Sequence, residues 1–256
     1  GVTGVQTCAL PILQELLSNI VSSSEGGGSM ALATERPIEK VLIIVITSDR
    51  GLAGAFNANT IKLTKSTIAE RYAEQYRKGN VTIWNIGKKG YEHFTKLNYN
   101  TDATYRDLFL HLSFENVQQA SKAAMKAFEE KQFDVVELVY SQFKNAATQK
   151  FEVERFLPIP KVEKKAGATQ ADFIYDPNKE LLIAELMPKI LNTQLFKAVL
   201  DSNASEHGAR MTAMDKASTN ANDMLRSLKI SYNRARQAAI TTELTEIVSG
   251  AAALQG

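Results

Sequence analysis

The chain has 256 residues, of which 44% are hydrophobic, 23% charged and 8% aromatic, and this composition excludes collagen-like, mucin-like and wholly disordered proteins. The 30 Lys and Arg residues against 28 Asp and Glu give a formal net charge of +2, which provides no general reason to expect nucleic acid as a partner. The longest apolar run, Val41–Ile46, is far shorter than the ~20 residues that span a bilayer, so any membrane association is expected to be peripheral. Cys8 is the single cysteine, which excludes an internal disulfide and a cysteine-based metal site.

The start of the chain divides into a leader, a short helical pattern and a linker. Gly1–Ile12 has no strand or helix periodicity and no basic region before its apolar stretch, so we expect a foreign or disordered leader rather than a signal peptide. Leu13–Val21 carries apolar residues at helical spacing and is interpreted as the end of a helix. The Ser- and Gly-rich stretch Ser22–Ser29 is typical of a flexible linker, and the remnant helix with its linker occupies residues 13–36.

Residues 37–187 alternate short apolar strands with amphipathic helices, which predicts an α/β domain with a mostly parallel, Rossmann-like sheet flanked by helices. Val41–Ile46 is apolar throughout, as expected of a strand buried on both faces. We expect a helix from about Asn57 to Arg77 whose inward side chains are Ile61, Ile68, Tyr72 and Tyr76.

The second half of this domain repeats the pattern. We predict strands at Val81–Ile86 and Val135–Tyr140, edge strands at Phe151–Phe156 and Phe173–Tyr175, helices at about Tyr91–Leu97 and Phe114–Glu130, and a surface loop from Pro158 to Gln170.

The first strand is followed by a glycine-containing turn, which raises the possibility of a phosphate-binding loop. Gly51 and Gly54 are spaced G-x-x-G, unlike the dinucleotide and Walker motifs, and Phe56 stands where the Walker motif has its lysine. The alternative, that the glycines satisfy tight-turn geometry, is favoured. We find no catalytic constellation, and His93, His111 and His207 are scattered without metal-ligand spacing.

The C-terminal part, residues 188–256, predicts one long helix. After Pro188 there is no further proline, and the only glycines in residues 189–254 are Gly208 and Gly250. This stretch is long enough for a helix of roughly 100 Å at about 1.5 Å per residue. A seam with alternating spacings of three and four predicts a left-handed coiled coil that requires a partner helix. The seam residues are Met211, Met214, Ser218, Ala221, Leu225, Leu228, Tyr232, Ala235 and Ala239.

Three motifs give this chain its resemblance to a known family. Ser205–Met214 reads S-E-H-G-A-R-M-T-A-M, and Ile240–Ala251 fits I-T-x-E-x-x-E-x-x-x-G-A at every fixed position. Ser48–Asn57 resembles S-D-R-G-L-C-G-x-[FY]-N, with Ala53 in place of the usual Cys. Over about Leu13 to Leu254 the chain resembles the gamma subunit of the rotary F-type ATP synthase.

This resemblance implies a mechanical function. The chain is expected to be an N-terminally incomplete central stalk, whose missing basic, Ala-rich helix would pair antiparallel with the C-terminal helix. It implies coupling of ion flow through the membrane ring to ATP synthesis by turning inside the alpha/beta hexamer. It also implies that the partners are the alpha, beta and epsilon subunits and the c-ring, and that the chain has no cofactor and no chemistry of its own. The implied location is peripheral, on the cytoplasmic face of a bacterial inner membrane, with an organelle inner membrane as the alternative.

The resemblance also implies contact residues. Arg236, Gln237, Thr241, Glu243 and Glu246 fall where the family's helix meets the catalytic subunits; ordinary surface polarity is the alternative.

Tyr140 and Phe143 lie in a segment similar to the family's Y-N-x-F-x-[NS], near the epsilon subunit and the ring, although Ser141 departs from that pattern and packing at the strand end is an equal alternative.

Two rival functions remain open from the sequence. One is an α/β nucleotide-binding enzyme with a helical arm, which requires a phosphate loop and a polar catalytic cluster. The other is a coiled-coil scaffold unrelated to ATP synthase, which requires only the seam. Assembly with alpha and beta subunits separates the family interpretation from both.

Overall fold

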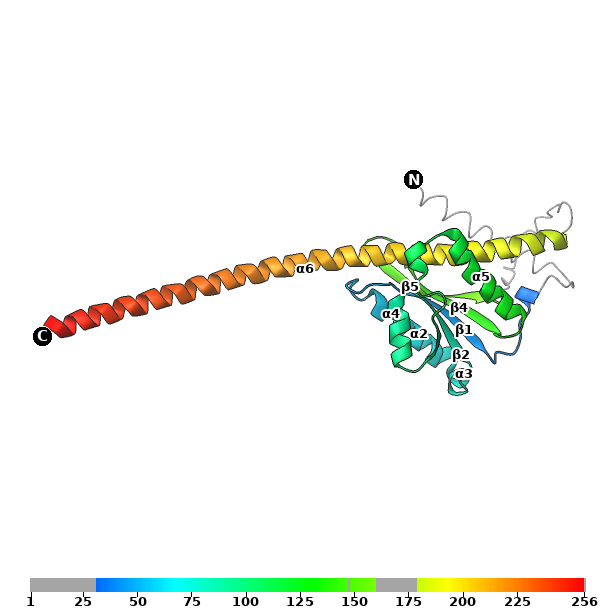
Figure 1. Ribbon diagram of the computed structural model, residues 1–256, viewed down its shortest axis with the longest axis horizontal. Coiled ribbons are helices and arrows are strands. Elements are labelled where there is room, and N and C mark those ends of the chain that lie inside the picture. The colour runs from blue at the N-terminus through cyan, green and yellow to red at the C-terminus, as the bar shows by residue number, and fades with distance from the viewer. Residues whose placement is uncertain (1–30, 147, 160–178, 256) are drawn as a thin grey trace, which may run out of the picture. The chain divides into compact units, whose positions relative to one another are not determined.

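The computed structural model describes residues 31–146, 148–159 and 179–255 (Figure 1). The chain divides into two compact units, of which the first ends at Arg210 and the second begins at Met211. The expected leader, the remnant helix at 13–21, the linker, the strand at 173–175 and most of the loop at 158–170 lie outside the described residues.

The first unit contains a five-stranded sheet in the order β3-β2-β1-β4-β5. β1 (Val41–Ile46) lies in the middle and pairs in parallel with both β2 (Val81–Ile86) and β4 (Val135–Phe143). β3 (Asn100–Asp102) is parallel to β2, and β5 (Gln149–Leu157) is antiparallel to β4. The predicted mostly parallel α/β sheet is therefore confirmed.

Burial explains why β1 occupies the centre. All six of its side chains are buried, because helices cover both faces of the sheet. The edge strand β3 was not predicted, since its polar residues Asn100, Thr101 and Asp102 carry no apolar alternation. Its place at the edge is consistent with this polarity.

The helix expected over Asn57–Arg77 is interrupted. α2 (Phe56–Arg71) and α3 (Ala73–Arg77) are separated by Tyr72, whose dihedral angles, φ −130° and ψ 28°, are not helical. The Tyr72 side chain is buried, and its hydroxyl donates to the carboxylate of Glu137 at 2.8 Å. The expectation that Tyr76 points inward was wrong, since Tyr76 lies beyond the break and is 42% exposed.

Two further helices complete the α/β pattern. α4 (Lys88–Lys96) begins three residues earlier than expected. α5 (Phe114–Glu129) follows the cap residue Ser113, whose hydroxyl accepts a hydrogen bond from the backbone N–H of Asn116. Short 3-10 helices occur at Ala31–Ala33 and Leu108–His111.

Two apolar clusters lie on opposite faces of the sheet. One joins α5 and the first part of α6 to β1 and β4, and the other joins α2 and α4 to β1 and β2. The alternation along β1 divides it between them, with Leu42 and Ile44 in the first cluster and Ile43 and Val45 in the second.

The long helix α6 extends from Lys179 to Gln255. It begins before the expected start, because Pro188 lies inside the helix rather than ahead of it. Proline costs one backbone hydrogen bond, but the adjacent Met187, Ile190 and Leu191 are buried against the first cluster and stabilise this turn. Gly208 lets α6 approach the loop after β4, since a Cβ at this position would lie 3.1 Å from the Cα of Ala146.

Candidate functional site

The second unit consists of the last part of α6, and its side chains are unburied. Every residue from Met214 to Leu254 is exposed. The predicted seam residues share this exposure: Leu225 is 51%, Leu228 60% and Tyr232 68% exposed. An apolar stripe of this kind on a helix typically marks a surface that another protein segment covers.

The apolar stripe does not end at Ala239. Ile240, Leu244 and Ile247 continue it with the same spacings of four and three, offset by one residue from the predicted seam, and they are exposed. The predicted seam ended at Ala239 and did not include these residues. Their spacing alone contains the signal.

The five residues expected to meet the catalytic subunits are all exposed on this helix: Arg236, Gln237, Thr241, Glu243 and Glu246. The Thr241 hydroxyl donates to the backbone carbonyl of Gln237 at 2.8 Å. It is therefore used as a donor within the helix and retains only its acceptor capacity for a partner.

The two residues expected at the epsilon and ring contact differ in accessibility. Tyr140 is buried, and its hydroxyl donates to Glu154 at 2.9 Å. Burial, reinforced by the neighbouring Glu154 carboxylate, raises the pKa of Tyr140 above its ordinary value. Phe143 is 37% exposed at the end of β4. Tyr140 therefore fits the alternative of packing at the strand end, whereas the exposed part of Phe143 is accessible to another subunit.

Several hydrogen bonds within the first unit hold the turn between β1 and α2. Asn57 accepts from the backbone N–H of Ser48 at 3.0 Å and donates from its amide to the Ser48 hydroxyl at 2.7 Å. Asp49 accepts from the backbone N–H of Lys88, and the Arg210 guanidinium donates to the carbonyl of Gly51 at 3.2 Å. Gly54 has a φ of +57°. These bonds agree with the turn-geometry interpretation of the glycines.

The edge where nucleotides bind in open α/β sheets is occupied here by the protein itself. In such folds the ligand lies beyond the carboxyl ends of the strands where the strand order reverses, which in this sheet is between β1 and β4. Ala53 and Phe56 after β1 pack against Ala209 of α6, and the Ser205 hydroxyl donates to the carbonyl of Ser141 near the end of β4. α6 therefore takes the position that a nucleotide would need.

Over the described ranges, no three His, Cys, Asp or Glu side chains come together in a way that could hold a metal ion. No helix within those ranges is both long and apolar enough to cross a membrane. His93 lines a pocket between α2 and α4, while His111 ends the second 3-10 helix and His207 lies in α6.

Comparison with known proteins gives consistent matches. A family model described as ATP synthase matches residues 11–254. The chain is 49% identical to the ATP synthase gamma chain of Cytophaga hutchinsonii, over 94% of this chain and 83% of that protein. It is 45% identical to the ATP synthase gamma chain of Flavobacterium johnsoniae, over 95% of this chain and 83% of the relative.

Solved structures share the fold. A chain of the Euglena gracilis mitochondrial ATP synthase, in a structure of OSCP, F1 and c-ring, superimposes with a TM-score of 0.60 at 19% identity, covering 96% of this chain and 89% of that chain. A chain from the central stalk and c-ring of the Tetrahymena thermophila enzyme gives a TM-score of 0.54 at 19% identity, covering 82% and 86%.

Proposed function

We propose, because this chain belongs to the family of ATP synthase gamma chains, that it is the central rotor shaft of an F-type ATP synthase. In this function the chain carries out no bond chemistry. It turns with the membrane ring and couples ion flow to ATP synthesis on the surrounding alpha and beta subunits.

One observation carries the proposal: α6 from Met214 to Leu254 is a helix without a buried side chain that bears both an apolar stripe and charged flanks. The chemistry of an α/β enzyme does not require such a surface, whereas a shaft that contacts surrounding subunits does. The stripe is suited to a partner helix, and the remaining faces are left for the subunits around it.

Coupling requires that the shaft contact its neighbours unequally. A shaft that bound all conformations of a catalytic subunit equally would shift none of them, however tightly it was held. We propose that Arg236, Gln237, Thr241, Glu243 and Glu246 make these unequal contacts. Arg236 can supply charge-assisted hydrogen bonds, and Gln237 neutral ones.

The proposed location is peripheral, on the cytoplasmic face of a bacterial inner membrane, with an organelle inner membrane as the alternative. Bacterial relatives support the first choice. Structural neighbours described as rotor, central stalk and c-ring support attachment through the ring. We propose the epsilon subunit as a further partner, with Phe143 as the candidate contact in this chain.

A rotation assay tests the proposal. Cys8 is the single cysteine, so a Cys8→Ser, Lys122→Cys chain carries one thiol, on the exposed face of α5. The chain is co-expressed with bacterial alpha and beta subunits, the complex is fixed to glass through beta, and a bead is attached to the thiol. ATP should make the bead rotate in one direction.

Two results would overturn the proposal. ATP hydrolysis by the chain alone would favour the nucleotide-binding enzyme. A complex that forms and hydrolyses ATP while the bead stays still would favour a static scaffold.

A further inference from the structure

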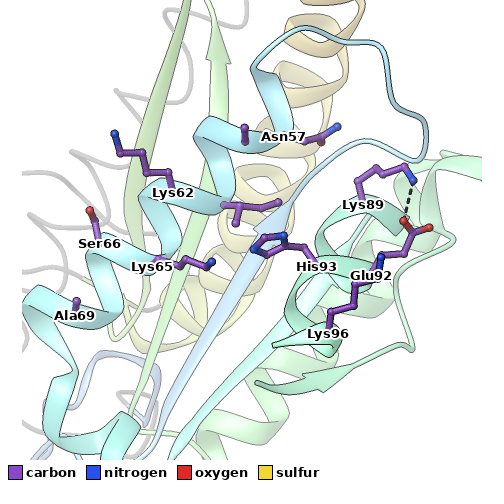
Figure 2. A pocket seen from close by; sticks show the side chains of 11 residues that line it. Asn57, Lys62, Lys65, Ser66, Ala69, Lys89, Glu92, His93 and Lys96 are labelled. Atoms are coloured by element: carbon purple, nitrogen blue, oxygen red, sulfur yellow. Dashed lines mark hydrogen bonds and ion pairs between the residues drawn. The ribbon is translucent and has the colours of Figure 1, made fainter. Parts of the chain in front are cut away.

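The groove between α2 and α4 forms a cavity of about 790 Å³ on the face of the sheet opposite α6. Lys62 and Lys65 line it from α2, and Lys89 and Lys96 line it from α4. In Figure 2 Lys65 points toward His93 on α4, whereas Lys62 points away from α4. A single carboxylate, that of Glu92, lines it as well. The lining therefore has four cations against one anion.

Most of this positive charge is uncompensated. Glu92 is paired with Lys89 at 2.8 Å. Lys62, Lys65 and Lys96 form no ion pair within the described parts of the chain. Three lysines without an ion pair thus line this open groove, and their like charges attract an anion to it.

We propose that this groove binds a small phosphate-bearing anion, with Lys65 and Lys96 as its principal charge partners. An ammonium group acts as a point charge with three donors, which suits the several oxygens of a phosphoryl group approached from different directions. The cavity volume falls within the usual range for small-molecule sites, roughly 300–1,000 Å³.

His93 lies beside the two lysines and so provides a probe of anion binding in the groove. Its ring extends from α4 toward α2, and Lys65 lies on the opposite wall (Figure 2). Burial lowers the pKa of His93, and the nearby Lys65 and Lys96 ammonium groups lower it further. A bound anion would offset these two charges and so raise the pKa of His93.

The lining favours a small anion over an acidic protein. Protein interfaces are enriched in aromatic residues, Met and Arg at their centres and depleted in Lys. The groove has no Phe, Tyr, Trp, Met or Arg in its lining, and its largest aliphatic side chain, Ile61, is already buried. A partner protein would find no anchor there.

The test is a proton NMR titration of the full chain with inorganic tripolyphosphate. The chain has three histidines, so the ring resonances of His93, His111 and His207 can be assigned by single substitutions. Saturation with tripolyphosphate should raise the pKa of His93 by a measurable amount and leave His111 and His207 unchanged. Binding should weaken as salt is added.

Paired variants decide whether the lysines are responsible. Lys65→Gln with Lys96→Gln should weaken tripolyphosphate binding about tenfold or more. Lys40→Gln with Lys122→Gln removes the same charge from exposed positions away from the groove and should leave the affinity unchanged.

Three outcomes would overturn the proposal. They are an unchanged pKa of His93 at saturating tripolyphosphate, an equal loss of affinity in both double variants, and binding of an acidic peptide where tripolyphosphate does not bind. A parallel titration with anionic lipid vesicles identifies the source of the phosphate. If only the vesicles raise the pKa of His93, the phosphate belongs to a lipid headgroup, and the proposal of a small soluble anion is wrong.

Discussion

At Gly87 the backbone itself requires a residue without a side chain. Its φ is +103°, a region that L-residues rarely adopt, and a Cβ there would overlap the carbonyl oxygen of Thr47. Since that carbonyl belongs to the segment directly after β1, neither partner can move without disturbing the sheet.

We therefore expect Gly87→Ala to lower the free energy of unfolding by about 2–4 kcal/mol, the combined cost of backbone strain and overpacking. Urea denaturation followed by circular dichroism measures this. Gly51→Ala is the control, because nothing lies within 4 Å of its added Cβ, and it should change stability by less than about 1 kcal/mol. Equal effects at the two positions would show that steric overlap is not the cause.

Buried tyrosines make the stability of the first unit sensitive to alkaline pH. Burial and the adjacent carboxylates of Glu137 and Glu154 raise the pKa values of Tyr72 and Tyr140 above the ordinary 10.0. Above pH 10 the unfolded chain loses these protons while the folded chain keeps them. The stabilisation is therefore complete below pH 10 and declines as pH rises beyond it.

Tyr140→Phe should reduce this dependence. It removes one of the shifted phenols, so the loss of stability with pH above 10 should become shallower by up to about 1.4 kcal/mol per pH unit. Urea midpoints measured between pH 9 and 12 test this. Tyr232→Phe, on the exposed part of α6, should keep the parental slope; a slope unchanged in Tyr140→Phe would contradict the assignment.

At the scale of the elements, α6 changes its environment along its length. Up to Arg210 the helix packs on the sheet, and from Met214 onward its residues are exposed. Met211, Leu225, Leu228 and Tyr232 lie on the apolar stripe, which in the isolated chain faces water. Such a stripe favours association between copies of the chain.

Replacing Leu225 and Leu228 by Gln should lower this self-association severalfold without changing the unfolding of the first unit. Sedimentation velocity over a range of concentrations measures the association. Met224→Gln with Ile230→Gln removes two exposed apolar side chains outside the seam and is the matched control. If the control reduces association as much as the seam variant, the heptad pattern has no special importance.

The sequence predicted these elements unevenly, for physical reasons. β1 and β4 were recognisable because burial on both faces demands apolar runs, as in Val41–Ile46. β2 was recognisable as a short, mostly apolar segment, Val81–Ile86. The break at Tyr72 was not recognisable, because the contact that this side chain makes, a hydroxyl bond to Glu137, is with a residue 65 positions away in the chain. Pro188 misled the prediction of the helix start, since packing on both sides of it outweighs the lost hydrogen bond.

The candidate site, too, could be predicted from the sequence only in part. The repeat of 3.5 residues predicted the apolar stripe, whose large side chains are exposed; its pairing with another helix stays a prediction. The lysine groove was not, because Lys65 and Lys96 belong to different helices, and only the parallel β1–β2 pairing brings those helices side by side.

For the whole molecule, the proposed rotor function makes a prediction about the tip of α6. Arg236→Ala with Gln237→Ala should impair assembly with alpha and beta subunits or reduce torque, since polar contacts unique to some rotor orientations are lost. The urea unfolding of the first unit should not change, because both residues are exposed in the second unit. Rotation assays and ATP-driven proton pumping provide the measurements, and normal coupling in the double variant would remove these residues from the proposed contact.

The buried Glu137 has a consequence for how the sheet assembles. Its carboxylate accepts from Tyr72 and from Arg71 at 3.2 Å, on the face of β4 that carries Val135 and Val139. A slip of β4 by one residue would turn this carboxylate toward the opposite cluster, among Leu42, Ile44 and Phe128, where an unpaired buried charge costs several kcal/mol. A single acidic side chain thus penalises a one-residue misalignment of β4 against its neighbours.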